Sequence, residues 1–387
     1  MKKKFNFKIV GSGPTGLLLS IALSKFDCDI FLTDLLTKDR LIDKDKTYAI
    51  THSTRKILSK FRLWEKLEPY LFGFDTLSIT DSVTSTFTNL TISDLDDDIS
   101  SLGNIGWVVK HSDLMDVFFQ EIDNYENIFF MTPQKLLSKK ILFDYQFLST
   151  GANSLDKKLI NFVDIKKSYN QSCLTFKVIL RGNCEKRAYE IFRKEGPLAL
   201  LPLEKNLYQV IWTSSTLKSI ERLNSDKNFL MDNLSTILPS EFKLDQIIGG
   251  FNIFPVSLSL NLPVLNLKKI VLVGDSFHTF HPVGGQGLNS CWRDVNTIFD
   301  IFNKNIAITK MDLILFKFKY FSSRILDIIF TILVTDSLIV LFANRNPLLF
   351  PIRRFSFVLL NNFLFIRKLV LNQMTKSLIY SRIKQNK

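Results

Sequence analysis

Apolar and polar residues alternate at the start of the chain, and Phe5–Val10 is predicted to form a short strand. The segment Gly11-Ser12-Gly13-Pro14-Thr15-Gly16 follows and opens an apolar stretch, which predicts a helix that ends near Lys25. A second apolar run over Cys28–Thr33 predicts another strand, which ends at Asp34. The chain therefore begins with a strand, a glycine turn, a helix and a second strand.

The glycines of this turn have the spacing G-x-G-x-x-G, and each has a separate physical role. Gly11 permits the tight turn, Gly13 lets the backbone approach a pyrophosphate, and Gly16 allows close packing of helix on strand. Pro14 suits a first helical position, and the helix N-terminus offers free N–H groups to phosphates. Asp34, 23 residues beyond Gly11, is placed to accept a hydrogen bond from a ribose hydroxyl. We favour a bound dinucleotide, and the alternative is a glycine turn that serves only helix packing.

The middle of the chain is rich in predicted strands. In chain order the predicted elements are a helix over Ser53–Leu67, strands over Thr76–Asp81, Ser85–Ile92 and Ile105–Val109, a helix from Ser112, short strands at Phe129–Phe130 and Phe143–Leu148, several strands between Cys173 and Trp212, and a helix over Ser215–Ile237. These strands stand between two nucleotide-type segments, which predicts a second domain inserted into the first. The predicted division is a discontinuous nucleotide-binding domain (1–75, 100–168 and 254–310), a substrate domain (76–99 and 169–253) and a helical, basic C-terminal region (311–387).

A second glycine-rich segment, Gly274–Asn289, follows a short buried strand predicted over Ile270–Val273. A strand, an acidic residue at its end and a glycine-rich start of a helix form a second ligand cradle. In such a cradle Asp275 can hold hydroxyl groups, and backbone N–H groups near Gly285–Leu288 can face a ring carbonyl where negative charge develops. This cradle suits a ligand that has a polar chain and a ring.

Asp275, His278 and His281 have a spacing that suits metal ligands, but Pro282 interrupts the helix that would align them. We therefore predict no metal site. His278 and His281 are the best general acid or base candidates in the chain, and Pro282 is a third candidate for a catalytic residue. A structural hydrogen-bonding role for the histidines stays open, and no catalytic base is assigned.

The composition describes a folded protein of more than one domain. A chain of 387 residues, with 46% hydrophobic and 22% charged residues, is long enough for two or three domains. Its four cysteines form no C-x-x-C pair, which excludes a disulfide framework and a zinc ribbon and indicates a reducing compartment; they are Cys28, Cys173, Cys184 and Cys291.

The formal charge of +13 is concentrated at the C-terminal end of the chain. No Asp or Glu occurs in Ser337–Lys387, which carries nine basic residues: Arg345, Arg353, Arg354, Arg367, Lys368, Lys376, Arg382, Lys384 and Lys387. Apolar runs such as Phe357–Leu360 and Phe363–Ile366 lie among them, a combination that suits an anionic lipid surface better than nucleic acid. A solvated helical face is the alternative.

The apolar region Leu326–Leu349 approaches the length of a membrane span. A charge near the middle of a span is expensive. We predict a buried or interfacial helix, because the region contains Asp327, Asp336 and Arg345.

The two glycine-rich segments together resemble those of the group A flavoprotein monooxygenases. The second, G-D-S-F-H-T-F-H-P-V-G-G-Q-G-L-N, is far more specific than the first. More narrowly, nearly the whole chain resembles the ubiquinone-biosynthesis hydroxylases, the group that contains 2-octaprenyl-6-methoxyphenol hydroxylase. The segments that carry this narrower resemblance are Leu63–Leu67, Gly106–Val109, Glu195–Leu203, Thr335–Leu338 and Arg353–Arg354.

The resemblance implies an α/β fold of two domains: a Rossmann-like FAD-binding domain of the glutathione-reductase type with an inserted β-sheet substrate domain, followed by a helical C-terminal region. It implies that the ribityl chain of FAD lies at Asp275, and that the ADP part lies at Gly11, Gly13, Pro14, Gly16 and Asp34. The flavin ring would then lie beside Pro282, Gly284, Gly285, Gln286, Gly287, Leu288 and Asn289.

The resemblance also implies a reaction and a place in the cell. NADH or NADPH would reduce the flavin, O2 would give a flavin C4a-hydroperoxide, and its distal oxygen would hydroxylate the aromatic ring of a polyprenylated phenol in ubiquinone biosynthesis. The protein would be cytoplasmic and peripherally associated with the inner membrane. Its partners would be the membrane surface and a ubiquinone-biosynthesis complex, and not nucleic acid.

Two residues depart from the family pattern. Lys46 stands where the family has an Arg that contacts the cofactor, which keeps the charge but loses the fork of donors. Thr150, within Ser149–Ser154, replaces an Asp that the family associates with FAD and pyridine nucleotide use. These departures motivate a second hypothesis, a non-catalytic or flavin-holding subunit of a quinone-biosynthesis complex. Another FAD oxidoreductase of the same fold, such as a reductase of prenyl chains, also stays open.

Overall fold

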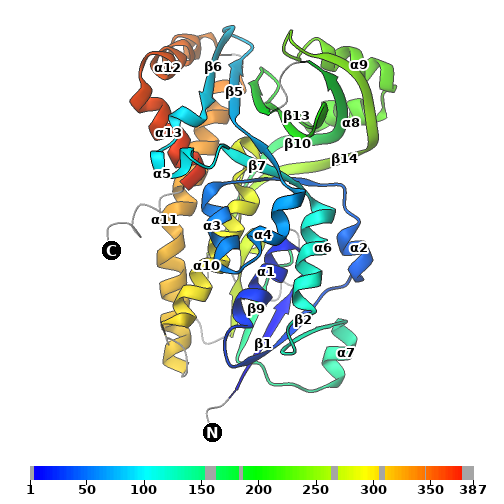
Figure 1. Cartoon of the computed structure of the whole chain (residues 1–387), viewed down its shortest axis with the longest axis vertical. Helices are drawn as coiled ribbons and strands as arrows, with labels where there is room; N and C mark the ends of the chain where they lie inside the picture. The colour runs from blue at the N-terminus through cyan, green and yellow to red at the C-terminus, as the bar shows by residue number, and fades with distance from the viewer. Residues whose placement is uncertain are drawn as a thin grey trace.

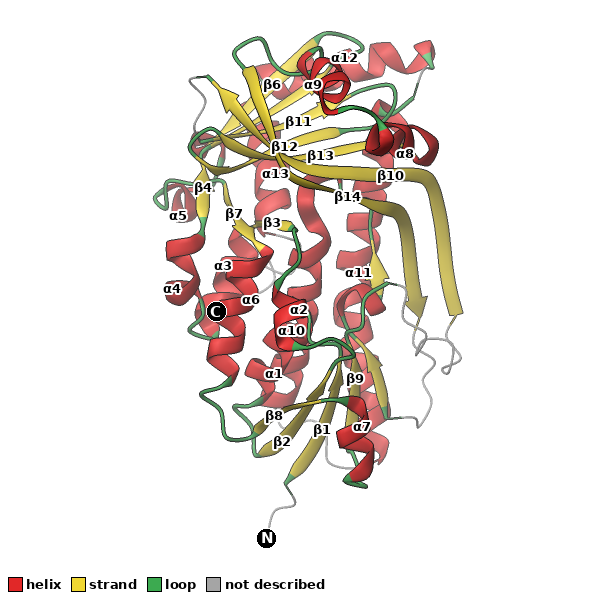
Figure 2. Ribbon diagram, turned by 90° about the vertical axis from the view of Figure 1, so that its right-hand side faces the viewer, coloured by secondary structure: helices red, strands yellow, loops and turns green. Residues whose placement is uncertain are grey.

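The computed structural model describes residues 4–152, 163–182, 186–262, 269–304, 310–344 and 346–376. Of the residues named above, these lie outside the described part of the chain: Asn153, Ser154, Cys184, Arg345, Arg382, Lys384 and Lys387. The molecule is elongated, with a small parallel sheet at one end and a larger sheet at the other (Figures 1 and 2).

A parallel sheet of five strands has the order β15–β9–β1–β2–β8. Its strands are β1 (Phe5–Val10), β2 (Cys28–Thr33), β8 (Ile128–Met131), β9 (Tyr145–Leu148) and β15 (Ile270–Leu272). Helix α1 (Pro14–Leu23) packs against α6 (His111–Ile122) and α10 (Gln286–Asn303) beside it. Strands buried on both faces are continuous apolar runs, which is why β1 and β2 have the predicted bounds. Since β1 and β15 both pair with β9, the turns that follow them lie at the same edge of the sheet.

The larger sheet has eight strands in the order β16–β14–β10–β13–β12–β11–β5–β6. The strands are β5 (Thr76–Asp81), β6 (Thr86–Thr91), β10 (Val163–Arg181), β11 (Arg187–Phe192), β12 (Leu198–Glu204), β13 (Leu207–Ser215), β14 (Lys243–Leu262) and β16 (His278–Thr279). Helices α8 (Thr216–Asn224) and α9 (Lys227–Ser235) contact β10 and β14. These two long strands bend away from the larger sheet toward the parallel sheet (Figure 2).

Strand β14 is the longest element that the sequence pattern did not predict. Its 20 residues include Gly249, Gly250 and Pro255, which are typical of strand ends. In the structure Gly249 has a φ of +74°, and the pairing with β10 shifts register at this point. A bulge therefore accommodates the glycines inside one continuous strand.

Two predicted helices are each divided in the structure. The helix predicted over Ser53–Leu67 is α3 (His52–Lys60) and α4 (Trp64–Leu67), separated at Arg62, which has a φ of +59°. The helix predicted over Ser215–Ile237 is α8 and α9, because the Asp226 side chain caps the start of α9. The remaining elements include a third sheet, β3 (Thr47–Ile50), β7 (Gly106–Lys110) and β4 (Phe72–Phe74), and the short helices α2 (Lys38–Ile42), α5 (Asp97–Ser100) and α7 (Pro133–Ser138).

The C-terminal region is helical, with α11 (Lys310–Phe342), α12 (Phe350–Asn362) and α13 (Leu364–Lys376). Helix α11 runs along the molecule and packs on α10 (Figure 1). Its segment Leu313–Phe342 is long and apolar enough to cross a membrane, and α12 with α13, bent by 100°, passes the same test as a pair. One side of α11 is nevertheless buried in the protein, where Phe316, Arg324 and Ile328 are 0% exposed.

Several basic residues of this region form ion pairs within the fold. Their partners are acidic residues that lie more than two hundred positions earlier in the chain. The pairs are Arg353 with Asp81 at 3.9 Å, Arg367 with Asp94 at 2.8 Å, and Lys376 with Asp96 and, at 3.2 Å, with Asp98. Part of the local charge excess in the sequence is therefore neutralised by the protein itself.

Candidate functional site

The turn between β1 and α1 has the tight geometry that its glycines predict. Gly11 has a φ of +99°, and a Cβ atom on it would lie 2.5 Å from the carbonyl oxygen of Ser149. A Cβ atom on Gly16 would lie 1.9 Å from the carbonyl oxygen of Gly11. At Gly13, in contrast, a Cβ atom would meet nothing within 4 Å. Gly11 and Gly16 thus serve the packing of the turn, whereas Gly13 borders open space where a ligand can approach.

Two polar groups at this turn fit a dinucleotide. The hydroxyl oxygen of Ser12 is buried and has no hydrogen-bond partner in the structure. The carboxylate of Asp34 accepts a hydrogen bond from the Ser12 N–H at 2.7 Å and one from the Leu36 N–H at 3.0 Å. A carboxylate has about four acceptor sites, so Asp34 retains capacity for a ribose hydroxyl.

The second glycine-rich segment lies against the first. A Cβ atom on Gly274 would be 3.0 Å from the Thr15 side chain, at the start of α1. The Trp292 indole N–H donates a hydrogen bond to the carbonyl oxygen of Pro14 at 3.3 Å. Asp275, the residue after Gly274, accepts a hydrogen bond from the Cys291 thiol at 3.3 Å. The structure therefore brings Asp275 and the Gly11–Gly16 turn together at one edge of the parallel sheet.

Lys46 and Thr150, which depart from the family pattern, lie beside the second segment. Burial lowers the pKa of Lys46, as does the charge of Lys44, while the charge of Asp275 raises it. Lys46 is therefore within electrostatic reach of Asp275. The Thr150 hydroxyl lies 3.4 Å from the Ser276 hydroxyl.

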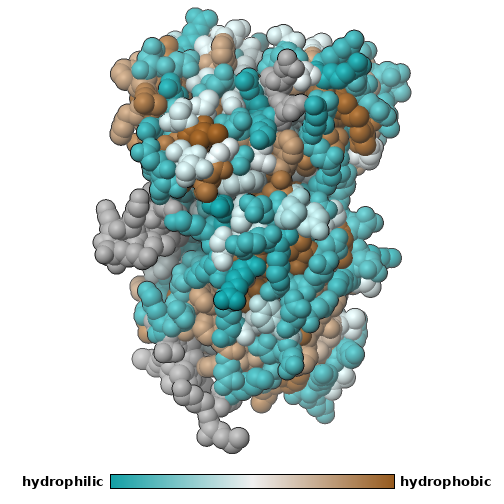
Figure 3. All heavy atoms as spheres, in the orientation of Figure 1, coloured by the Kyte–Doolittle hydropathy of each residue, from teal (hydrophilic) through white to brown (hydrophobic). Residues whose placement is uncertain are grey.

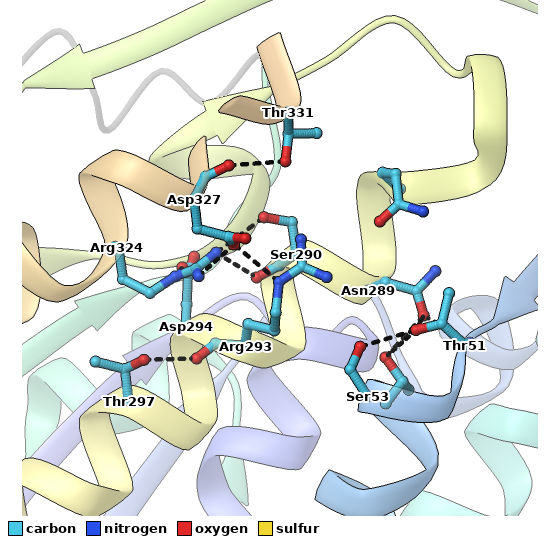
Figure 4. A network of polar contacts seen from close by, with 12 residues as sticks. Thr51, Ser53, Asn289, Ser290, Arg293, Asp294, Thr297, Arg324, Asp327 and Thr331 are labelled. Atoms are coloured by element: carbon cyan, nitrogen blue, oxygen red, sulfur yellow. Dashed lines mark hydrogen bonds and ion pairs between the residues drawn. The ribbon is translucent and has the colours of Figure 1, made fainter. Parts of the chain in front are cut away.

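The turn into α10 is built from left-handed glycines, since Gly284 and Gly285 have φ values of +72° and +62°. Asn289 fastens this turn to β3 and α3: its amide donates to the Ala49 and Gly285 carbonyls, each at 2.8 Å, and its oxygen accepts from Thr51 and Thr54 (Figure 4). The Gln286 side chain donates to the carbonyl oxygens of Gly284 and Met374. A Cβ atom on Gly287 would meet nothing within 4 Å. The side chains of Gln286 and Asn289 are thus engaged by the protein, which leaves the backbone of the turn near Gly287 and Leu288 to face a ligand.

The two candidate histidines are buried, and neither lines the apolar cavity that adjoins the turn into α10. His278 is 0% exposed and lies 3.0 Å from the Asp294 carboxylate. His281 is 1% exposed and lies 3.2 Å from the side-chain oxygen of Gln171. Burial lowers the pKa of His281 to about 4, so its ring is neutral at pH 7. This geometry favours the structural role for both histidines, whereas Pro282 does line the cavity.

A buried ion cluster joins the second segment to α11 (Figure 4). Arg324 donates hydrogen bonds to Asp294 and Asp327, each at 2.6 Å, and Arg293 donates to Asp327 at 2.9 Å. Asp294 also accepts from the Gly274 N–H at 2.9 Å. Burial would raise the pKa of Asp294, but its interactions with His278 and Arg324 outweigh this effect and lower the pKa to about 2. The sequence signal for this cluster was the presence of charges within the apolar helix α11.

A cavity of about 500 Å³ adjoins the turn into α10. It lies between the strands β5, β11 and β12 of the larger sheet, the 282–286 turn, and the helices α11 to α13. Most of its lining is apolar, with Ile79, Leu201, Phe342, Phe357 and Leu371 among the large side chains. Among the described residues that line it, the charged side chains are Glu190, Arg293 and Asp327. Such a cavity suits an aromatic or isoprenoid ligand.

Comparison with known proteins gives sequence relatives, although no protein-family model matches the chain. An uncharacterised protein of Synechocystis is 26% identical over 309 residues, which span 75% of this chain and 73% of that protein. The 3-demethoxyubiquinol 3-hydroxylase of Escherichia coli is 24% identical over 212 residues, which span 51% of this chain and 54% of that protein. Ubiquinone biosynthesis monooxygenase COQ6 of Dictyostelium discoideum is 22% identical over an alignment of 406 residues, which spans 85% of this chain and 80% of that protein.

The chain is homologous to the ubiquinone-biosynthesis monooxygenases. These homologues confirm the narrower resemblance, to the ubiquinone-biosynthesis hydroxylases, which was inferred from five short segments in addition to the two glycine-rich ones.

Solved structures with the same fold include a monooxygenase and a protein that was solved with FAD. The p-nitrophenol 4-monooxygenase PnpA of Pseudomonas putida superposes with a TM-score of 0.75 at 14% identity, over 97% of this chain and 99% of that one. An HpxO variant of Klebsiella pneumoniae, solved in complex with FAD, superposes with a TM-score of 0.69 at 12% identity, again over 97% of this chain and 99% of that one. The predicted Rossmann-like α/β fold is therefore confirmed.

Proposed function

We propose that this protein is an FAD-dependent aromatic hydroxylase that acts on a polyprenylated phenol in ubiquinone biosynthesis, using NADH or NADPH and O2. The observation that carries the proposal is the meeting of the two glycine-rich segments at one sheet edge, beside a largely apolar cavity. The homologues named for ubiquinone biosynthesis support the same conclusion.

The residues at the sheet edge suit the parts of FAD. Gly11, Gly13, Pro14, Gly16 and Asp34 would hold its ADP part, where the free Ser12 hydroxyl and the open face of Gly13 leave room for phosphates. Asp275 would hold the ribityl hydroxyls, with Lys46 nearby. Backbone groups of Pro282, Gly284, Gly285, Gln286, Gly287, Leu288 and Asn289 would border the flavin ring. When bound, FAD takes electrons from the pyridine nucleotide and activates O2.

The cavity suits the aromatic head of a prenylated substrate. Its volume of about 500 Å³ is in the range of small-molecule sites. Its apolar walls would exclude water from the reacting atoms. A hydroxylase needs this exclusion, because water promotes side reactions that consume the activated oxygen. The protein thus contributes binding, orientation and the exclusion of water.

The domain boundaries predicted from the sequence remain a proposal.

We propose that the outer side of α11, α12 and α13 rests on an anionic lipid surface. It exposes large apolar side chains, among them Leu326, Leu333, Val340, Ile352, Phe355 and Phe365. Figure 3 shows apolar residues gathered at the upper left, over the region of α12 and α13. Arg354 is exposed among them and suits lipid phosphates. Because α11 to α13 also line the cavity, a prenyl tail in the lipid would lie close to its site.

The alternative of a flavin-holding subunit rests on Thr150 and Lys46, and a turnover assay separates the two. The purified full chain should be yellow, and it should oxidise NADH or NADPH faster when a short-chain prenylphenol is added. Colourless protein after gentle purification would contradict the proposal, and yellow protein without stimulated oxidation would favour the subunit. In a deletion strain, mass spectrometry of the accumulated quinone precursor would identify the ring position or reveal a prenyl-chain reductase instead.

A further inference from the structure

Glu190 places a carboxyl group in the wall of the apolar cavity. It lies on β11, where Ala188 and Phe192, two residues away on either side, also line the cavity. Its cross-strand neighbours are Ala199 on β12 and Ile79 on β5. Both neighbours line the cavity too, so the carboxyl stands on an apolar sheet face.

A carboxyl group in such a place is costly unless it has hydrogen-bond partners. The Gly284 N–H, in the turn that would border the flavin ring, is close enough to Glu190 to stabilise its charged form. Burial raises the pKa of Glu190 to about 7, and the Gly284 N–H opposes this rise. One N–H donor satisfies only part of a carboxylate, which accepts about four hydrogen bonds.

The other ionisable groups around Glu190 have partners of their own. Arg293 and Asp327, which share the cavity, form an ion pair at 2.9 Å. The Cys173 thiol lies 3.1 Å from the Thr213 hydroxyl; burial raises its pKa to about 11, the Thr213 contact opposes this rise, and the charge of Glu190 adds to it. Within the described residues, no Lys or Arg lies within ion-pair distance of Glu190. A ligand that enters the cavity can therefore supply a donor to its carboxyl.

We propose that Glu190 is a catalytic residue that binds the phenolic hydroxyl of the aromatic substrate and accepts its proton. This inference rests on the proposed function. In the step, the O–H bond of the phenol breaks, an O–H bond to a Glu190 oxygen forms, and the negative charge moves to the phenolate oxygen. No electron is gained or lost by the pair, and the proton passes to solvent after the product leaves. The phenolate has a more electron-rich ring, which is more readily hydroxylated.

The experiment compares two ligands, a phenol and the ether in which a methyl group replaces the hydroxyl hydrogen. The FAD-loaded full chain is titrated with para-hexylphenol and with its methyl ether, para-hexylanisole, by isothermal titration calorimetry. The wild type should bind the phenol at least about tenfold more tightly than the ether, because the ether leaves the carboxyl without a donor. Glu190→Gln should reduce this preference to less than about threefold and lower kcat/KM for phenol hydroxylation by about 10²-fold or more.

A matched control is Glu204→Gln, the same change on β12 at an exposed residue that pairs with Lys110. It should keep the wild-type preference. If Glu190→Gln keeps the wild-type preference for the phenol, the inference is overturned while the proposed function stands. The same holds if the variant weakens the binding of the phenol and the ether equally, as a loosened Gly284 turn would. If the wild type binds neither ligand, both are overturned. Glu190→Asp, which retains a carboxyl, should restore part of the preference, and its failure to do so would count against the inference.

Discussion

Gly13 and Gly16 lie three residues apart, yet the structure gives them opposite roles. A methyl group on Gly13 would enter open space, whereas one on Gly16 would collide with the backbone of Gly11. We expect Gly13→Ala to change the free energy of unfolding by less than about 1 kcal/mol and to weaken FAD binding at least about tenfold, because the methyl group occupies the approach of the pyrophosphate. Gly16→Ala should lower the free energy of unfolding by more than about 2 kcal/mol.

Urea denaturation of the apoproteins and titration with FAD would measure the two effects separately. If Gly13→Ala bound FAD as tightly as the wild type, the ADP part would not lie at this turn.

The raised pKa of Glu190 gives a prediction for the pH dependence of the reaction. A carboxyl accepts a proton only when it is ionised, so kcat/KM should fall as the pH drops below about 7, by up to tenfold per pH unit. Glu190→Gln should remove this acidic limb together with most of the activity, and the Glu204→Gln control should retain it. A wild-type profile that is flat from pH 8 to about 5, measured by substrate-stimulated oxidation of NADH or NADPH, would argue against Glu190 as the base.

At the scale of elements, α11 depends on its buried charges. Arg324 is 0% exposed and bonds to both Asp294 and Asp327. Arg324→Met should lower the free energy of unfolding by about 3–5 kcal/mol, because it leaves two buried carboxylates short of a partner. Arg354→Met, at an exposed position of α12, should change it by less than about 0.5 kcal/mol. Equal stability of the two variants in urea denaturation would mean that the cluster does not hold α11 in place.

The elements also show which parts of the fold could be predicted from sequence. β1 and β2 matched their predicted bounds, because a parallel strand covered on both faces is a continuous apolar run. β14 escaped prediction because Gly249 and Gly250 occupy a bulge inside it, and a local pattern cannot distinguish a bulge from a strand end. The break at Arg62 escaped for a similar reason, since a non-glycine residue with positive φ has little sequence signature.

At the scale of the whole molecule, the sequence predicts a substrate pocket between the sheet near residues 173–213 and the flavin, but not the residues that line it. Its walls come from β5, β11, β12, the turn before α10 and the C-terminal helices, which only the tertiary fold brings together. Glu190 had no motif around it, and its signal was a single acid in a strand whose other residues, apart from Arg187, are apolar or aromatic. The ligand site at the edge of the parallel sheet, in contrast, was predictable, because each of its two glycine-rich segments has a recognisable local spacing. The structure adds that the two segments lie side by side.

The proposed membrane surface also belongs to the whole molecule. Leu333 and Phe355, on α11 and α12, are 60% and 61% exposed. The double variant Leu333→Glu with Phe355→Glu should bind vesicles of phosphatidylethanolamine and phosphatidylglycerol at least about tenfold more weakly than the wild type, because it loses apolar contact and adds negative charge. Leu217→Glu, at an 82% exposed residue of α8, should bind as the wild type does. Equal co-sedimentation of all three proteins would place the lipid contact elsewhere or exclude it.

The most direct test of the central claim follows the oxygen atom. The FAD-loaded full chain is incubated with NADH or NADPH, a short-chain prenylphenol and isotopically heavy O2, and the product is analysed by mass spectrometry. We predict that one heavy oxygen atom enters the aromatic ring for each pyridine nucleotide oxidised in the coupled reaction. A product without the heavy atom, or no product although FAD is bound and reduced, would contradict the assignment of this protein as an aromatic hydroxylase.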